Sequence, residues 1–304
     1  MIAQMQTPRR LPSWFKGTLP DSSSEAYART LTDAFVHTVC HEAHCPNQVT
    51  CAHEGHCTFM LLGPQCTRAC RFCVVKKATG AALEVERDQS QRITTAVKRL
   101  GLSYVIITSV TRDDLSDGGA GVFAKTIACV KRLSANMRVE VLIPDFLGNK
   151  ESVRCVAHAQ PVVVAHNIET VPRLYASVRP QADYCRSLEV LRSAKEVNPM
   201  IMTKSSLMVG LGETKEEVFT CLKDLRSVDC DILTIGQYLA PTPDHYPVQE
   251  FIDPERFEWY ELIGEQMSFR AVASGPLVRS SFRAQEMFER AFTNRYPLSI
   301  KRYA

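Results

Sequence analysis

Cys66-Thr67-Arg68-Ala69-Cys70-Arg71-Phe72-Cys73 is the stretch that decides the fold, because it places three cysteines on one short loop with the spacing C-x3-C-x2-C. The loop follows the apolar run 59–62, which predicts a buried strand, and Gly63-Pro64, which ends that strand. Three thiolates bind three irons of a [4Fe–4S] cluster and leave the fourth iron open. The stretch therefore predicts a reactive iron–sulfur site at the end of a first strand.

A second set of cysteines lies upstream, where Cys40, Cys45 and Cys51 have the spacing C-x4-C-x5-C. Since cysteine fills 12 of 304 positions, chance produces either pattern in roughly 2% of such chains and both in fewer than about 0.1%. Four histidines lie around this set: His41, His44, His53 and His56. A zinc site made by the three cysteines and one histidine is an alternative, although the spacing is looser than that of the usual zinc site.

The composition indicates one large α/β domain or two small ones, since 45% of the residues are apolar. The net charge is +3 without a block of Lys or Arg, so nucleic-acid binding is not indicated. Half of the cysteines lie in the two sets at metal-ligand spacing, which favours a reducing compartment over a disulfide scaffold. No secretory signal precedes Trp14, and no apolar run reaches the roughly 18 residues of a membrane helix. We therefore expect a soluble, cytoplasmic protein.

Short apolar runs alternate with amphipathic segments from residue 58 onward. The expected strands are 58–62, 103–108, 138–143, 161–166, 201–208 and 231–235. The expected helices are 88–100, 120–134, 149–159, 186–197, 214–226 and 254–269. Nearly continuous apolar runs are typical of parallel strands covered on both faces, and six βα units with right-handed crossovers predict a partial (β/α)6 TIM-like barrel.

The segment before the barrel is expected to contribute little regular structure. We expect a polar surface arm over 1–21 and then a helix from about 22 to 39, for which Ser22-Ser23-Ser24-Glu25 fits a capping box. The upstream cysteines would then lie in an irregular loop.

The cysteine loop resembles that of the radical S-adenosylmethionine (SAM) superfamily, and the two sets in this order, with Cys45-Pro46-Asn47, resemble the lipoyl synthase family within it. R-D-D-L-x-D-G-G-A from Arg112, H-N-x-E-T from His166, M-V-G-L-G-E from Met208 and G-Q-Y-L-x-P from Gly236 are similar to sequences of that family. The resemblance implies the same partial barrel over 58–269. It also implies an N-terminal extension over 1–57, which carries the auxiliary-cluster cysteines, and a C-terminal extension over 270–304.

The resemblance further implies two [4Fe–4S] clusters and SAM as cofactors. The cluster on Cys66, Cys70 and Cys73 would bind SAM at its open iron and cleave it to a 5′-deoxyadenosyl radical. The upstream cysteines would hold an auxiliary cluster whose fourth ligand is Ser281, because Arg279-Ser280-Ser281-Phe282 resembles the family motif R-S-S-Y. A serine oxygen is a hard ligand for an iron–sulfur cluster, so that one iron would be lost readily from a cluster that is dismantled as the sulfur donor.

Polar residues follow the ends of the predicted strands, where parallel barrels gather functional side chains. Asn167 and Glu169 could hold the ammonium group or the ribose hydroxyls of SAM. Arg179 could bind a carboxylate or pair internally. Lys204 lies within an apolar strand, so we expect it to reach the SAM carboxylate or to pair with Glu169.

The implied activity is insertion of two sulfur atoms at C6 and C8 of an octanoyl chain on a carrier-domain lysine. An unactivated methylene has no acidic proton, so the reaction requires cofactor-borne radical chemistry. The implied partners are carrier domains of 2-oxoacid dehydrogenase E2 subunits and the glycine cleavage H protein, with a reductase such as flavodoxin or ferredoxin. A biotin synthase-like enzyme and a zinc-bound scaffold without catalysis remain alternatives.

The chain departs from the family pattern at three positions. Phe282 replaces the usual tyrosine, His41 stands where glutamate is common, and Cys57 is an additional cysteine before the first strand. We expect Cys57 to be a buried thiol that could also bind iron wrongly. The remaining cysteines are expected to be small core residues: Cys129, Cys155, Cys185, Cys221 and Cys230.

Overall fold

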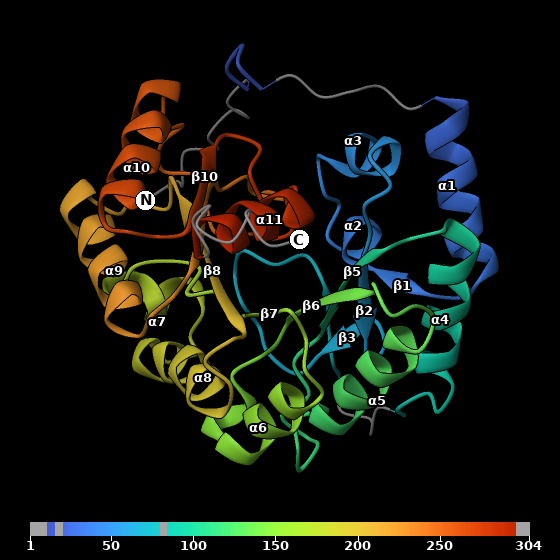
Figure 1. Ribbon diagram of the computed structural model, residues 1–304. Coiled ribbons are helices and arrows are strands. Elements are labelled where there is room, and N and C mark those ends of the chain that lie inside the picture. The colour runs from blue at the N-terminus through green and yellow to red at the C-terminus, as the bar shows by residue number, and fades with distance from the viewer. Residues whose placement is uncertain (1–10, 16–20, 80–83, 296–304) are drawn as a thin grey trace, which may run out of the picture.

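A curved sheet of eight strands forms the centre of the computed structural model, which describes residues 11–15, 21–79 and 84–295 (Figure 1). Seven strands are parallel and neighbour one another in chain order: β2 (Thr58–Leu61), β5 (Tyr104–Ser109), β6 (Arg138–Leu142), β7 (Val163–Ala165), β8 (Met202–Val209), β9 (Ile232–Gln237) and β10 (Ala271–Gly275). The short strand β1 (His37–Thr38) pairs antiparallel with the outer edge of β2. Because β2 and β10 end the parallel series without pairing to each other, the barrel is partial, as predicted.

Helices between the strands cover the outer face of the sheet (Figure 1). They are α4 (Gln89–Leu100), α5 (Ala120–Lys131), α6 (Lys150–His158), α8 (Tyr184–Val197), α9 (Lys215–Ser227) and α10 (Pro254–Gln266), with the short turns η1 (Phe146–Gly148), η2 (Pro172–Leu174) and α7 (Tyr175–Val178). Thr214 and Glu217 form the predicted capping box of α9, and Asp253 caps α10 ahead of Pro254. Within the part of the chain that the structure describes, no helix combines the length and the apolar character that crossing a membrane requires.

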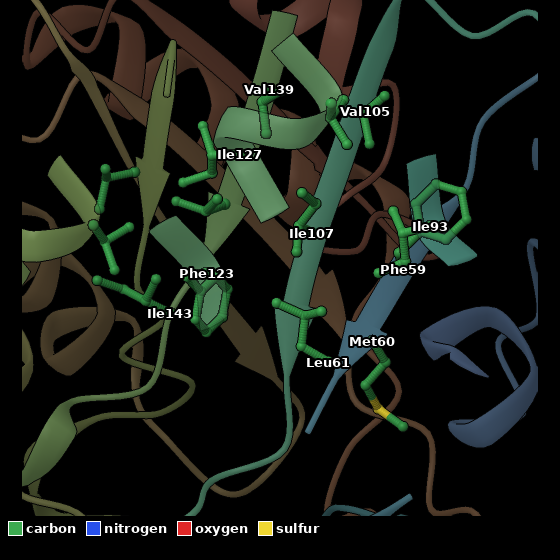
Figure 2. Close-up of a cluster of buried hydrophobic side chains, with 14 of the residues drawn as sticks. Phe59, Met60, Leu61, Ile93, Val105, Ile107, Phe123, Ile127, Val139 and Ile143 are labelled. Carbon is green, nitrogen blue, oxygen red and sulfur yellow. The ribbon is translucent and has the colours of Figure 1, made fainter. Parts of the chain in front are cut away.

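The core between the sheet and helices α4 and α5 is tightly apolar (Figure 2). Ile107 of β5 and Phe123 of α5 are both fully buried, and Ile93 of α4 is nearly so. Burying one side chain of this size stabilises the fold by about 1.5–3 kcal/mol. This packing explains why the apolar runs of the sequence predicted the strands well.

The sheet continues past the six predicted strands. β10 pairs in parallel with β9, and α11 (Ala284–Arg295) follows it. Met287 and Phe288 of α11 pack against residues at the amino-terminal ends of the strands, among them Tyr104 and Met202. The predicted boundary at residue 269 therefore separates from the barrel a strand and a helix that complete its sheet and fill its amino-terminal end.

The segment before the barrel is more regular than predicted. Helix α1 (Ser22–Asp33) is capped by Asp21 together with Ser24, so the capping box begins one residue earlier than expected. The helix ends six residues early, because the chain reverses at Phe35, whose φ is +51°, and then forms β1. The upstream cysteines lie on two short helices, α2 (Val39–Glu42) and α3 (Gln48–His53), and not in an irregular loop. Of the predicted arm over 1–21, residues 1–10 and 16–20 lie outside the described residues.

The other cysteines only partly match the prediction of a core role. Cys221 and Cys230 are buried and Cys129 is half-buried, whereas Cys155 and Cys185 are exposed. Cys155 lies on α6 and Cys185 lies on α8, and both face solvent from these amphipathic helices. The prediction that these two cysteines are core residues is therefore wrong.

Candidate active site

A cavity of about 610 Å³ opens at the carboxyl-terminal ends of the parallel strands. Ser109 of β5, Ser206 of β8 and Gln237 of β9 contribute to its wall. The cluster loop (residues 66–73), the upstream set (Cys40, Cys45 and Cys51) and the terminal segment (residues 278–282) line the same cavity. Three parts of the chain that are far apart in sequence therefore share one site.

The cluster loop is held in place by its own backbone. The amide of Thr67 donates to the carbonyl of Thr111 at 3.0 Å, and the amide of Arg71 donates to the carbonyl of Val178 at 2.8 Å. These bonds attach the loop to the segment that follows β5 and to the last residue of α7. The three cysteines of the loop therefore line the cavity from a backbone that is hydrogen-bonded to two other segments.

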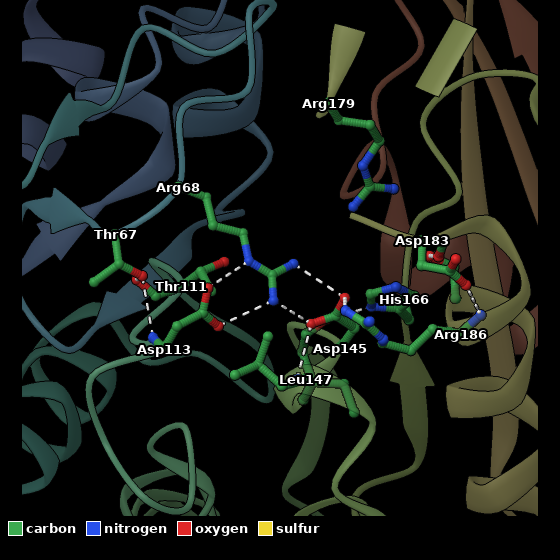
Figure 3. A network of polar contacts seen from close by, with 12 residues as sticks. Thr67, Arg68, Thr111, Asp113, Asp145, Leu147, His166, Arg179, Asp183 and Arg186 are labelled. Carbon is green, nitrogen blue, oxygen red and sulfur yellow. Dashed lines mark hydrogen bonds and ion pairs between the residues drawn. The ribbon is translucent and has the colours of Figure 1, made fainter. Parts of the chain in front are cut away.

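Arg68, in the middle of the cluster loop, is a buried cation held by two aspartates (Figure 3). Its guanidinium donates to Asp113 at 2.7 and 3.0 Å and to Asp145 at 2.5 and 3.0 Å. Arg186 approaches the same Asp145 carboxylate at 3.3 Å. Burial disfavours the charged form of Asp145, but the hydrogen bonds and charge of Arg68 outweigh it and hold the pKa at about 2. Two bidentate pairs thus fix the cluster loop to the ends of β5 and β6.

The upstream set lies where the N-terminal helices meet the C-terminal part of the chain. Cys40 is on α2, Cys51 is on α3, and Cys45 lies between them. The side-chain amide of Asn47 donates to the carbonyl of Leu277 at 2.6 Å. This bond spans 230 positions of sequence and brings the terminal segment beside the upstream set.

The terminal segment joins the two halves of the cavity. Ser280 donates a hydrogen bond to Asn167 Oδ1 at 3.0 Å, and the positive charge of Arg279 acts on Cys45. Ser281 lies on the cavity wall with the upstream set. The approach to β9 is close, since a Cβ on Gly236 would lie 2.0 Å from the carbonyl oxygen of Val278. The path of the terminal segment past β9 therefore requires glycine at position 236.

The cysteines of the cavity are free thiols. None of the 12 cysteines forms a disulfide, and in the described ranges no three His, Cys, Asp or Glu side chains converge as ligands of a single metal ion. Burial raises the pKa of Cys51 to about 12 and that of Cys70 to about 11, so these thiols would release protons on binding metal. Contact with the Cys57 thiol holds the pKa of Cys40 at about 7. Both cysteine triads thus lie on one cavity wall as free thiols.

Three of the four predicted SAM contacts lie at the cavity. Asn167 donates to Glu169 Oε1 at 3.0 Å, and burial raises the pKa of this glutamate. Glu169 also has a φ of +62°, a strained conformation that is concentrated at functional sites. Arg179 donates to the carbonyls of Asn167 and Ile168 at 2.9 and 3.1 Å and lies over the ring of Tyr175. One face of Arg179 is thus paired internally while the residue still lines the cavity.

Lys204 does not lie at the cavity, and the expectation that it contacts SAM or Glu169 is wrong. Its ammonium group pairs with Glu140 at 2.8 Å, and Tyr104 donates to the other oxygen of that carboxylate at 2.6 Å. Lys204 is the third residue of β8, so it projects near the amino-terminal end of the barrel. The sequence could not reveal Glu140 as the partner, because it lies in another strand, 64 positions away.

The acidic residues in the motifs that resemble the lipoyl synthase family mostly stabilise turns. Asp114 pairs with Arg112 at 2.7 Å, and Asp117 accepts from two backbone amides at the start of α5, each at 2.8 Å. Glu213 accepts from the amide of Gly210 at 2.6 Å. These bonds shape the loops around the cavity without placing a carboxylate in it.

His166 lines the cavity, although no role was assigned to it from the sequence. Its Nδ1 lies 2.8 Å from the carbonyl of Ile143, which assigns the ring proton to Nδ1. Burial lowers the pKa of His166 to about 4, so the ring is neutral at physiological pH. Its Nε2 is buried and has no partner in the described part of the chain. A neutral acceptor thus remains available beside Asn167.

Comparison with known proteins agrees with this geometry. The sequence profile of the radical SAM superfamily matches residues 60–225. The chain is 51% identical over 275 residues to the lipoyl synthase of Caldanaerobacter subterraneus, covering 90% of this chain and 96% of that protein. It is 52% identical over 283 residues to the lipoyl synthase of Caldicellulosiruptor saccharolyticus, covering 93% and 98%.

Solved structures with little sequence similarity share the fold. Methylornithine synthase matches with a TM-score of 0.55 at 16% identity, covering 84% of this chain and 72% of that chain. HydG, a maturase of the [FeFe]-hydrogenase, matches with a TM-score of 0.58 at 12% identity, covering 88% and 66%. At such identities the likeness concerns the fold alone.

Proposed function

The chain belongs to the lipoyl synthase family of the radical SAM superfamily, and from this premise we propose that it inserts two sulfur atoms into a protein-bound octanoyl chain. The sulfurs enter at C6 and C8 of an octanoyl-lysine, and the product is a lipoyl-lysine. A [4Fe–4S] cluster at Cys66, Cys70 and Cys73 supplies, with SAM, the radical chemistry that an unactivated methylene requires. A second [4Fe–4S] cluster is the sulfur-donating substrate.

The single observation that carries this proposal is the shared cavity. Both cysteine triads and Ser281 line it, although they come from the two ends of the chain and from the loop after β2. A carbon radical must meet its sulfur donor before it meets solvent, so a common enclosed space suits the reaction. In this proposal residues 1–57 supply three ligands of the donor, and residues 58–269 form most of the radical SAM barrel. Residues 270–304 contribute β10 and α11 to that barrel and supply Ser281.

The side chains beside the cluster loop bind and orient SAM. Glu169 accepts hydrogen bonds from the SAM ammonium or ribose hydroxyls, and its pair with Asn167 orients its carboxylate. Arg179 contributes a positive charge that binds the SAM carboxylate. Asn167 also accepts from Ser280 at 3.0 Å, so the SAM side of the cavity is directly coupled to the segment that carries Ser281.

The apolar part of the wall suits an alkyl chain. Met60, Ile106 and Leu142 come from three adjacent strands and line the same cavity as the two triads. Such side chains exclude water from the octanoyl carbons that lie against them. The chain's own contribution to the chemistry is therefore to hold the two clusters, the SAM and the alkyl carbons in a dry and fixed arrangement.

The proposed partners follow from the substrate. The octanoyl-lysine belongs to carrier domains of 2-oxoacid dehydrogenase E2 subunits or of the glycine cleavage H protein. A flavodoxin or ferredoxin supplies electrons to the cluster at the cluster loop. Twelve cysteines without a disulfide fit a reducing compartment, and we propose the cytoplasm.

The test is an anaerobic reconstitution with iron, sulfide, SAM, a reductant and an octanoyl-lysyl peptide, followed by mass measurement of the peptide. We expect about eight irons per chain, as two [4Fe–4S] clusters require, and a product with two added sulfurs. Cys40→Ala should retain SAM cleavage without sulfur transfer, whereas Cys70→Ala should stop both. Lipoyl product from the Cys40→Ala protein would contradict the assignment of the sulfur donor.

The same preparation separates the alternatives. A zinc-bound scaffold would contain zinc and no visible colour, because Zn²⁺ is a d¹⁰ ion. A biotin synthase-like enzyme would cleave SAM and leave the octanoyl peptide unchanged.

A further inference from the structure

Lys77 is a cation to which the proposed reaction gives no role, and the chain path holds it beside the cluster loop. It lies on β4 (Lys76–Lys77), which pairs with β3 (Gln65–Cys66) so that Lys77 and Cys66 are register partners. The amide of Ala78, the next residue, donates to the carbonyl of Cys66 at 2.8 Å. The segments that enter and leave the cluster loop are thereby joined through their backbones.

The side chain of Lys77 reaches the other two cysteines of the loop. Its ammonium group donates to the carbonyl of Cys73 at 2.9 Å and to that of Cys70 at 3.5 Å. Lys77 is half-buried, and it takes part in none of the ion pairs that the described residues form. A positive charge without a carboxylate partner in that part of the chain therefore lies against the backbone of two proposed cluster ligands.

Lys77 lies outside the cavity. Among the described residues, Cys73, Val74 and Val75 line the cavity and Lys77 does not. Its ammonium group is bonded to the backbone of the loop, whereas the cysteines of the loop belong to the cavity wall. The influence of Lys77 on the chemistry in the cavity therefore passes through the cluster loop and not through contact with SAM.

We propose that Lys77 sets the reduction potential of the cluster at the cluster loop, because it holds a positive charge beside two of the cluster's ligands. The inference rests on the proposed function, since it requires a [4Fe–4S] cluster at Cys66, Cys70 and Cys73. Lys77 is then a positioning residue that acts through the cluster and its loop.

The direction of the effect follows from charge. Reduction of the cluster adds one electron, supplied by the proposed flavodoxin or ferredoxin, and therefore one negative charge. Net charge and the groups around the ligands are among the determinants of iron–sulfur potentials. A cation nearby stabilises the reduced form more than the oxidised form, and partial burial limits its screening by salt. Removing the charge of Lys77 should therefore shift the potential to a more negative value.

The experiment uses the full chain with Cys40, Cys45 and Cys51 all replaced by Ala, which leaves the cluster loop as the proposed cluster site. After anaerobic reconstitution with iron and sulfide, the iron content is measured. The reduction potential is then determined by a redox titration followed by EPR.

Three substitutions separate the charge of Lys77 from its hydrogen bonds. Lys77→Gln keeps a donor for the carbonyls without the charge, Lys77→Met removes both, and Lys77→Arg keeps both. We expect the parent, Gln and Arg proteins to bind about four irons per chain, as one [4Fe–4S] cluster requires. The potential should shift negatively with Gln, shift at least as far with Met, and stay near the parent value with Arg.

The matched control is Lys76→Gln. Lys76 is the neighbouring residue of the same strand, is exposed, and points to the opposite face of the strand. This substitution removes the same charge from the chain and should leave the potential close to the parent value.

Four results would overturn the inference. The first two are an unchanged potential in Lys77→Gln and an equal shift in Lys76→Gln. The third is a shift in Lys77→Arg as large as that in Lys77→Gln, because the charge would then not be the cause. The fourth is loss of iron from Lys77→Gln, since Lys77 would then only fasten the loop. A parent protein without any cluster at the cluster loop would refute the proposed function itself.

Discussion

Replacing Arg68 by Met should destabilise the protein strongly, because it leaves two carboxylates without their cation. Arg68 and Asp145 are almost fully buried, with side-chain exposures of 4% and 0%, whereas Asp113 is 25% exposed. Methionine retains most of the aliphatic length and removes only the guanidinium. After the substitution, Arg186 at 3.3 Å remains as a partner of Asp145.

The magnitude can be worked out from Asp145. Lowering of its pKa from 3.8 to about 2 corresponds to about 2 kcal/mol of stability near neutral pH. Breaking a buried pair by removing one partner typically costs 3–5 kcal/mol. The remaining contact with Arg186 reduces the loss, so we expect about 3 kcal/mol for Arg68→Met. The exposed pair of Arg154 and Glu151 provides the control, since Arg154→Met should cost less than about 0.5 kcal/mol.

The assay is anaerobic urea unfolding followed by circular dichroism at several pH values. Asp145 has a lowered pKa in the folded protein, so its contribution is complete above about pH 4 and is lost as the pH falls toward 2. The difference between the wild-type protein and Arg68→Met should therefore shrink over that range. In the Arg68→Met protein, the additional substitution Asp145→Asn should recover part of the lost free energy of unfolding at neutral pH. A difference that stays constant from pH 6 to pH 3, or that matches the Arg154 control, would refute this account of Arg68.

Three further predictions concern the cavity and the barrel. Ser281→Cys replaces a hard ligand by a soft thiolate, so the auxiliary cluster should lose iron to a chelator more slowly and transfer less sulfur; faster iron loss would contradict the role of Ser281. Gly236→Ala should displace the terminal segment, because its Cβ would lie 2.0 Å from the carbonyl oxygen of Val278, and a crystal structure with an unmoved segment would disprove this. Lys204→Met should lower the free energy of unfolding by about 3–5 kcal/mol, because it leaves Glu140 buried without its cation. The KM for SAM should not change, and an increase in it would restore Lys204 to the SAM site.

The strands of the barrel were predictable because they are buried on both faces. The run Tyr104–Ser109 is almost entirely buried, and such runs indicate a parallel strand from composition alone. β10 was not predictable in this way, since Ala271–Gly275 is short and made largely of small residues. Its form comes from its pairing with β9 and from the packing of α10 and α11 against it.

The cysteines of the candidate site were recognisable from their spacing, because ligands on one loop are close in sequence. Contacts between distant segments left no such pattern. Arg68 pairs with residues 45 and 77 positions away, and Ser280 bonds to Asn167 across 113 positions. Lys204 was misassigned for the same reason, since its partner Glu140 is 64 positions away.

Helix α11 bears on the order of events in the proposed reaction. It packs at the amino-terminal end of the barrel, and the cavity lies at the carboxyl-terminal ends of the strands. On the proposed function, SAM, the lysyl arm of a carrier and a protein that delivers iron and sulfide would all approach from the carboxyl-terminal end. A carrier that stays bound after lipoylation would then block repair of the spent donor, so the rate of successive turnovers should depend on how quickly the finished carrier departs.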